Sequence, residues 1–81
     1  MENLLFVTGE EGDWEGLYVK GKLVKEGHEL TKYDVLDALK EYNFDLGFEY
    51  GEYTINQEYL DDYGLSIYFK KIDESMLTKN T

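Results

Sequence analysis

Short apolar runs separated by glycine predict strands in the first third of the chain. Residues 4–8 form a mostly apolar stretch that stops at a glycine, which is typical of a buried strand. Two further runs, residues 16–19 and 22–25, flank the dipeptide Lys20-Gly21. A two-residue loop with glycine in second place favours a type I′ turn, in which Lys20 has to adopt a positive φ. We therefore expect a buried strand followed by a β-hairpin.

The expected hairpin has apolar residues on both of its faces. With the turn in that place, Tyr18 faces Leu23 and Leu17 faces Val24 across the two strands. Successive side chains of a strand point to opposite faces, so these two pairs belong to different faces. Gly27 is expected to end the second strand of the hairpin.

Helical spacing begins after the hairpin. Thr31 is a suitable N-cap, and Asp34 three residues later gives a weakened form of the capping box. The apolar residues that then fall on one side at helical spacing are Val35, Leu36, Ala38, Leu39 and Tyr42. The acidic residues on the opposite side are Asp34, Asp37 and Glu41. We expect an amphipathic helix that ends near Asn43.

The second half of the chain predicts two strands with a short helix between them. Residues 48–55 have β character but are interrupted by Gly51, whereas residues 65–72 (LSIYFKKI) form a strong final strand. Between them, Asn56 is a suitable N-cap for a helix over residues 57–63. A glycine follows at the position where a helix-ending residue with positive φ belongs.

This order of elements predicts an α+β fold. The whole chain, residues 1–81, is expected to be a single domain, with residues 75–81 as a flexible tail. The sheet is expected to have three or four mostly antiparallel strands, with the main helix packed on one face and a second short helix nearby. Either the short helix or a second copy of the chain covers the other face, and the candidates to line it are Tyr18, Tyr50, Tyr53 and Tyr68.

Acidic and aromatic residues are concentrated in the middle of the chain. Eight lysines and no arginine stand against eighteen acidic residues, so the net charge is −10. Residues 41–69 contain seven acidic residues, no lysine and six of the eight tyrosines. Solubility alone explains a high net charge, but it does not require the charge to be segregated. The segregation indicates a surface that attracts a basic partner.

The same composition excludes several classes of protein. Direct nucleic-acid binding is disfavoured, because the phosphates would be repelled and no arginine is present. The longest apolar run is far too short to span a membrane. The chain has no cysteine, which fits a reducing compartment. We therefore expect a cytoplasmic protein that binds neither nucleic acid nor membrane directly.

Residues suited to catalysis are few. His28 is the only histidine and cysteine is absent, so neither a zinc site nor an activated nucleophile is predicted. The glycines do not form a phosphate-binding loop. Carboxylate pairs such as Asp61/Asp62 arise by chance among so many acids, and a chain of this size hardly builds the cleft that a glycosidase needs. We expect no enzyme activity, no metal and no cofactor.

Trp14 and the acidic, tyrosine-rich segment are the candidate binding residues. Trp14 is either an edge residue of the core, packed on the hairpin, or an anchor for a partner, since tryptophan and tyrosine are enriched at binding hot spots. Tyrosine among acids supplies contact area at low entropic cost. The predicted partner-binding residues are Trp14, Asp34, Asp37, Glu41, Glu49, Tyr50, Glu52, Tyr53, Glu58, Tyr59, Asp61, Asp62 and Tyr63.

Two stretches of the chain belong together here: Asp13 to His28 (DWEGLYVKGKLVKEGH) and residues 33–39 (YDVLDAL). This combined segment resembles a group of small uncharacterised bacteriophage and prophage proteins. The resemblance covers roughly residues 13–40, about half of the chain. It implies a hairpin followed by a helix, a phage origin and no catalytic signature. Small acidic phage proteins are often host-takeover factors, a class that includes nucleic-acid mimics and inhibitors of host enzymes, among them metabolic enzymes such as enolase.

These observations leave three functions open. The first is a phage-type protein that binds a basic surface of a host protein in the host cytoplasm and inhibits or modulates it by stoichiometric contact. The second is a nucleic-acid mimic that blocks the basic groove of a DNA- or RNA-binding protein. The third is a non-enzymatic structural or assembly subunit. The small core and the number of tyrosines also predict a homodimer, although the net charge opposes close approach of acidic faces.

Overall fold

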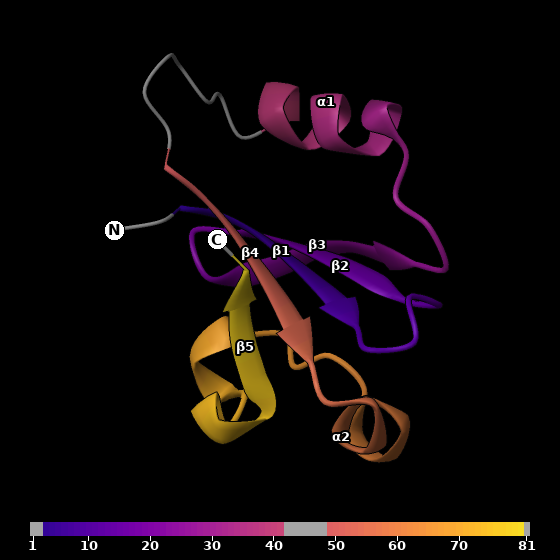
Figure 1. The fold of residues 1–81 in the computed structure, drawn as a ribbon. Helices are drawn as coiled ribbons and strands as arrows, with labels where there is room; N and C mark the ends of the chain where they lie inside the picture. The colour runs from indigo at the N-terminus through magenta and orange to yellow at the C-terminus, as the bar shows by residue number, and fades with distance from the viewer. Residues whose placement is uncertain (1–2, 42–48, 81) are drawn as a thin grey trace.

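The computed structural model describes residues 3–41 and 49–80, and it has an α+β fold in which a mixed sheet lies between two helices (Figure 1). The strands of this part of the chain are β1 (Leu4–Gly9), β2 (Glu15–Val19), β3 (Lys22–Gly27), β4 (Tyr50–Ile55) and β5 (Leu77–Asn80). The helices are α1 (Lys32–Glu41), α2 (Gln57–Tyr63) and the short 3₁₀ helices η1 (Phe69–Lys71) and η2 (Glu74–Met76). No helix in these ranges has the length and apolar character needed to cross a membrane.

Strand β1 is the centre of the sheet, whose order is β3-β2-β1-β4-β5. It is antiparallel to β2 and parallel to β4, and the outer pairs β2–β3 and β4–β5 are antiparallel. The α+β class and the mostly antiparallel pairing are therefore confirmed, but the described residues form five strands where three or four were predicted. The parallel pair was also missed, since it joins strands that are far apart in the sequence.

The predicted hairpin forms, with one change of register. Both residues of its turn have positive φ, 52° and 83°, as a type I′ turn requires. Tyr18 faces Leu23 as predicted, but Leu17 lies opposite Lys25 and not Val24, because the register shifts between Leu17 and Tyr18. This irregularity leaves Val24 as an extra residue on β3, and its side chain packs with the cluster under α1.

Each face of the sheet carries its own hydrophobic cluster, because successive residues of β1 point to opposite sides. The cluster on the α1 side has the buried residues Leu4, Leu17, Val19 and Ala38. The cluster on the α2 side has the buried residues Leu5, Val7, Tyr18, Ile55, Leu60 and Ile72. The short helix α2 packs on the second face of the sheet, as one of the two predicted arrangements required. The predicted homodimer stays a prediction.

Helix α1 begins at the predicted capping box, but the side that it packs against the sheet differs slightly from the predicted one. The Thr31 amide donates to Asp34 Oδ2 at 2.8 Å and the Asp34 amide donates to Thr31 Oγ1 at 3.3 Å, which completes the capping box. Ala38 is buried against the sheet, whereas Leu36, predicted on the same side, is 57% exposed. The predicted core position of Tyr42 and the predicted helix end at Asn43 lie outside the described residues.

Helix α2 agrees with its predicted caps. Asn56 Oδ1 accepts from the Tyr59 amide at 3.0 Å, and the amide of Gly64, at φ 68°, donates to the Leu60 carbonyl at 2.8 Å. Strand β4 runs without a break through Gly51, which is buried, so the predicted interruption there is wrong. The predicted start of this strand at Phe48 lies outside the described residues.

The predicted final strand over residues 65–72 does not form. Only an isolated bridge between Tyr68 and Lys22 is present, and η1 follows it. Phe69 and Ile72 both face the cluster on the α2 side. Residues three apart lie on the same side of a 3₁₀ helix but on opposite sides of a strand. A 3₁₀ turn therefore lets both side chains reach the core, which the predicted strand would not. Residues 77–80, expected in a flexible tail, instead form β5 along the edge of β4.

Candidate functional site

Acidic side chains gather at the end of the sheet where β1 stops and α2 begins. We call this region the acidic pole; its residues are Glu10, Glu11 and Asp13 of the β1–β2 loop, Glu26 of β3, and Glu58, Asp61 and Asp62 of α2. Neither the loop nor α2 contains a lysine. The acidic pole therefore presents charge of one sign from three separate segments of the chain.

Hydrogen bonds fix the acidic loop to the start of α2. The Gln57 amide donates to Glu10 Oε1 at 2.8 Å, and the Glu11 amide donates to Gln57 Oε1 at 3.0 Å. The first amides of a helix have no partner within the helix and carry partial positive charge, so a carboxylate is favoured there. Glu10 thus has a structural role, and it holds the loop beside α2.

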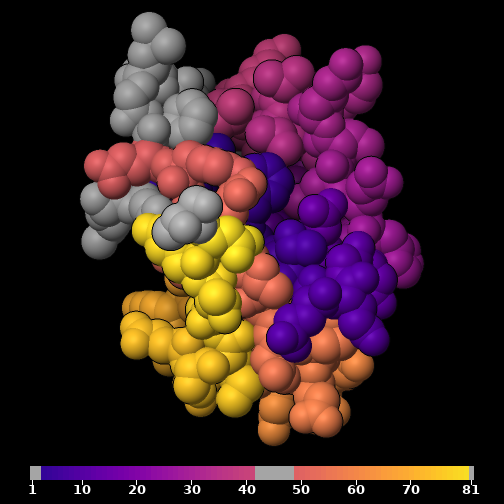
Figure 2. Space-filling view, viewed as in Figure 1, coloured from indigo at the N-terminus to yellow at the C-terminus, as the bar shows by residue number. Residues whose placement is uncertain are grey.

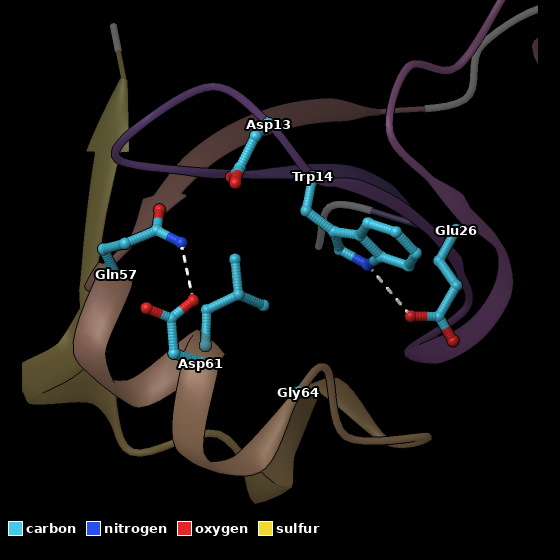
Figure 3. A pocket seen from close by; sticks show the side chains of 7 residues that line it. Asp13, Trp14, Glu26, Gln57, Asp61 and Gly64 are labelled. Carbon is cyan, nitrogen blue, oxygen red and sulfur yellow. Dashed lines mark hydrogen bonds between the residues drawn. The ribbon is translucent and has the colours of Figure 1, made fainter.

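A hollow of about 230 Å³ lies between the loop and α2 (Figure 3). Its lining residues are Asp13, Trp14, Glu26, Gln57, Leu60, Asp61 and Gly64. Trp14 closes one side, where its indole N–H donates to Glu26 Oε1 at 3.1 Å and its ring meets that of His28 edge-on at 5.0 Å between centroids. On the opposite side, Gln57 Nε2 donates to Asp61 Oδ1 at 2.9 Å. The side walls of the hollow are thus held by hydrogen bonds.

The hollow combines an aromatic ring with carboxylates from three segments. Each of Glu26 and Asp61 uses one carboxylate oxygen in the bonds just described, which leaves its second oxygen to accept from a ligand. A cation over an indole ring is favoured by the ring quadrupole, and charge-assisted hydrogen bonds to carboxylates are stronger than neutral ones. The chemistry of the hollow therefore suits an ammonium or guanidinium group.

Predicted site residues lie on both sides of α2. Trp14 and Asp61 line the hollow in Figure 3, and Glu58, Tyr59, Asp62 and Tyr63 line a second hollow of about 240 Å³ next to Met76. The rings of Tyr59 and Tyr63 are 4.9 Å apart, which confirms that they share one side of the helix. Tyr59 packs against the core, whereas Tyr63 is 75% exposed.

The other predicted site residues lie elsewhere in the fold. Asp34, Asp37 and Glu41 belong to α1, on the opposite face of the sheet, and the surfaces of α1 and α2 stand at opposite ends of the view in Figure 2. The residues at the start of β4 and just before it are Glu49, Tyr50, Glu52 and Tyr53. The structure therefore does not bring all the predicted residues into one surface.

These residues already have partners within the fold. The Tyr50 hydroxyl donates to the Glu52 carboxylate, and partial burial together with this bond raises the pKa of Tyr50 to about 12. The Tyr53 ring packs 5.1 Å from the ring of Phe69, at the margin of the cluster on the α2 side. Tyr53 thus contributes to the core, and Tyr50 lies on the face that α1 covers in part.

Sequence reasoning missed Asp13, Glu26 and Gln57 as parts of the site. The pairing of Glu15 with Gly27 in the hairpin brings residues 13–14 beside residues 26–28, so the expected hairpin already contained this information. The arrival of α2 opposite Trp14 had no such signal, because it depends on the parallel pairing of β4 with β1.

Comparison with known proteins identified no relative, since no family model, curated protein or solved structure matches the chain. Within the described ranges, no group of three or more histidine or acidic side chains has an arrangement that could hold a metal ion. The residues of the hollow themselves are therefore the basis for the function proposed below.

Proposed function

We propose that this protein acts without catalysis, by docking its acidic pole onto a lysine- or arginine-rich surface of another protein. The observation that carries the proposal is the hollow at Trp14, where an aromatic ring and three carboxylates surround a space that Leu60 also lines. A lysine or arginine side chain can lay its aliphatic part along Leu60 and direct its charge to the carboxylates. One cationic side chain of the partner would thus serve as an anchor.

The rest of the acidic pole supports the approach and the fit. Glu58 and Asp62 add negative potential beside the hollow, which increases the association rate with a basic surface and makes it sensitive to salt. Tyr63 adds exposed aromatic area of the kind enriched at protein interfaces. The mechanism is steric: the bound protein covers a site or displaces a subunit of its partner.

The sequence resemblance to small phage proteins suggests in which organism and on which class of partner this mechanism would operate. A small acidic phage protein with such a surface would be a host-takeover factor. Its partner would be a host protein with a basic surface, for example a metabolic enzyme such as enolase. It would act in the host cytoplasm. These assignments depend on the resemblance over residues 13–40 and add to the physical argument without replacing it.

Charge reversal on the two helices tests the proposal. The double substitution Asp61→Lys with Asp62→Lys alters the acidic pole, and Asp37→Lys with Glu41→Lys makes the same change of net charge on α1. Immobilised protein first captures partners from bacterial lysate at low and high salt, and each purified partner is then titrated by calorimetry. We expect the α2 reversal to weaken binding at least about tenfold and to reduce its salt dependence, and the α1 reversal to have a much smaller effect.

Equal losses of affinity from the two reversals, or a loss from the α1 reversal alone, would contradict the assignment of the binding surface.

Competition with duplex DNA for the partner distinguishes this function from nucleic-acid mimicry. Duplex DNA displaces a mimic from its partner, because both occupy the same basic groove, whereas an inhibitor bound elsewhere on an enzyme is not displaced.

A further inference from the structure

A third pocket, lined by lysines and apolar residues, lies at the other end of β1. It has a volume of about 520 Å³, within the usual range for binding sites. Leu5, Tyr68 and Phe69 supply its apolar and aromatic lining, and Lys20 and Lys70 also line it. Leu5 and Gly9 lie at opposite ends of β1, so this pocket is about 13 Å along the strand from the acidic pole.

The walls of this pocket are fixed by the fold. The Phe69 amide donates to the Gly21 carbonyl at 2.9 Å, and the Leu23 amide donates to the Ile67 carbonyl at 2.7 Å, so residues 67–69 are bonded to the hairpin. The Phe69 ring lies 5.5 Å from the ring of Tyr18, whose hydroxyl donates to the Ser66 carbonyl at 2.5 Å. The pocket is therefore formed before any ligand arrives.

Most residues that line the pocket are basic or apolar, and Asn3 and Gly21 complete the lining. Lys20 and Lys70 line it, Lys22 is paired with Tyr68, and Lys71 follows in η1, so half of the eight lysines in the sequence lie in the two segments around it. The exposed fraction is 60% for Ile67 and 50% for Tyr68. Tyr68, which lines the pocket, and Ile67, which precedes it in the sequence, therefore expose apolar area.

We propose that this pocket binds an acidic peptide segment of a partner protein, which inserts one large apolar side chain between Leu5 and Phe69. Carboxylates on either side of that side chain pair with Lys20 and Lys70. The charge of the pocket complements such a segment, and screening confines the repulsion from the acidic pole to about 8–10 Å at physiological salt. A nucleic acid is less suited, because its many phosphates would meet the net charge of −10 as well.

A peptide accounts for more of this surface than a small amphiphile does. A free fatty acid would fill the apolar part of the pocket, but it would place only one anion beside the two lysines, Lys20 and Lys70. A peptide segment with a carboxylate on either side of its apolar side chain can pair with both lysines. The inference does not rest on the function proposed for the acidic pole, because the two sites share no lining residue.

The test uses the full chain, labelled with ¹⁵N, and an acetylated, amidated peptide of sequence Asp-Glu-Phe-Asp-Glu. The controls are the matched peptide Lys-Lys-Phe-Lys-Lys and sodium octanoate. We expect the acidic peptide to shift the amide signals of Leu5, Gly21 and Phe69, and the basic peptide to leave them unchanged. Absence of these shifts at millimolar peptide would overturn the proposal, as would tighter binding of octanoate than of the acidic peptide.

Two double substitutions then locate the site. Lys20→Glu with Lys70→Glu should weaken the acidic peptide at least about tenfold, whereas Lys32→Glu with Lys40→Glu, the same change of net charge on α1, should have little effect. Equal effects would refute the assignment. Lys70→Glu alone repeats the test if the substitution in the hairpin turn disturbs folding. Shifts of the Trp14 indole signal with an arginine peptide report the acidic pole separately.

Discussion

Gly16 lies where β2 passes under the segment that follows α2. A Cβ at this position would be 2.3 Å from Leu65 Cδ1 and 3.2 Å from Leu23 Cδ1. We expect Gly16→Ala to lower the free energy of unfolding by about 1–3 kcal/mol, because the neighbouring side chains must leave their packed positions. Urea unfolding measures this. Gly27→Ala is the control, since no atom lies within 4 Å of its added Cβ, and an equal loss there would contradict the packing.

Tyr18 makes the free energy of unfolding depend on pH in the alkaline range. Burial holds the pKa of its phenol well above the usual value, and the charge of Glu26 raises it further. The folded state therefore keeps Tyr18 neutral. Its contribution is fully present below the unfolded pKa of about 10 and is lost as pH rises from there toward the folded pKa.

The substitution Tyr18→Phe tests this coupling. Near neutral pH it should cost about 0.5–1.5 kcal/mol, because the hydrogen bond to the Ser66 carbonyl is lost. Above pH of about 10, stability should fall less steeply with pH in the variant than in the parent, so the difference between them narrows. Denaturant unfolding across this range measures both effects, and parallel curves would contradict the assignment.

At the scale of elements, β5 is a strand that the sequence did not predict, because its residues were expected in a flexible tail. Leu77 is half-buried and packs against the cluster on the α2 side, whereas Thr78 is exposed. We expect Leu77→Ala to lower the free energy of unfolding by about 1–2 kcal/mol, as partial loss of a buried leucine side chain implies. Thr78→Ala should change it by less than about 0.5 kcal/mol. If neither substitution has an effect in thermal unfolding, residues 77–80 are a tail after all.

Elements defined by local signals could be predicted from the sequence. The turn at Lys20-Gly21, the box at Thr31 and the cap at Asn56 each depend on residues within a few positions, and all three form. Tertiary contacts decided the rest. Phe69 turns inward to meet Tyr18, and this contact replaces the expected final strand with η1.

The candidate site was predictable in composition but not in shape. Trp14 and Asp61 were both expected to bind a partner, and they line the same hollow. The acids of α1 were grouped with them because sequence shows charge but not which face of a sheet a helix covers. Helix α1 follows β3 onto one face and α2 follows β4 onto the other, so their acids are separated.

At the scale of the whole molecule, charge is the dominant long-range force. With a net charge of −10 and an acidic pole of three segments, the folded state brings like charges closer together than the unfolded chain does. We expect the melting temperature to rise when salt is increased from about 0.02 M to about 0.5 M, because screening weakens this repulsion. Calorimetry at fixed pH measures it, and a falling melting temperature would contradict the argument. Sedimentation in the same buffers decides whether the predicted homodimer exists.

The parallel seam between β1 and β4 divides the sheet into a three-stranded and a two-stranded part. The first part can assemble from neighbours in sequence, but until β4 arrives β1 remains an open edge with unsatisfied amides and carbonyls. In concentrated refolding mixtures that edge can pair with β4 from another molecule in place of its own, although tethering favours its own β4 at low concentration. Exchange of the β4–β5 ribbon between molecules would then give intertwined dimers whose yield grows with protein concentration during refolding.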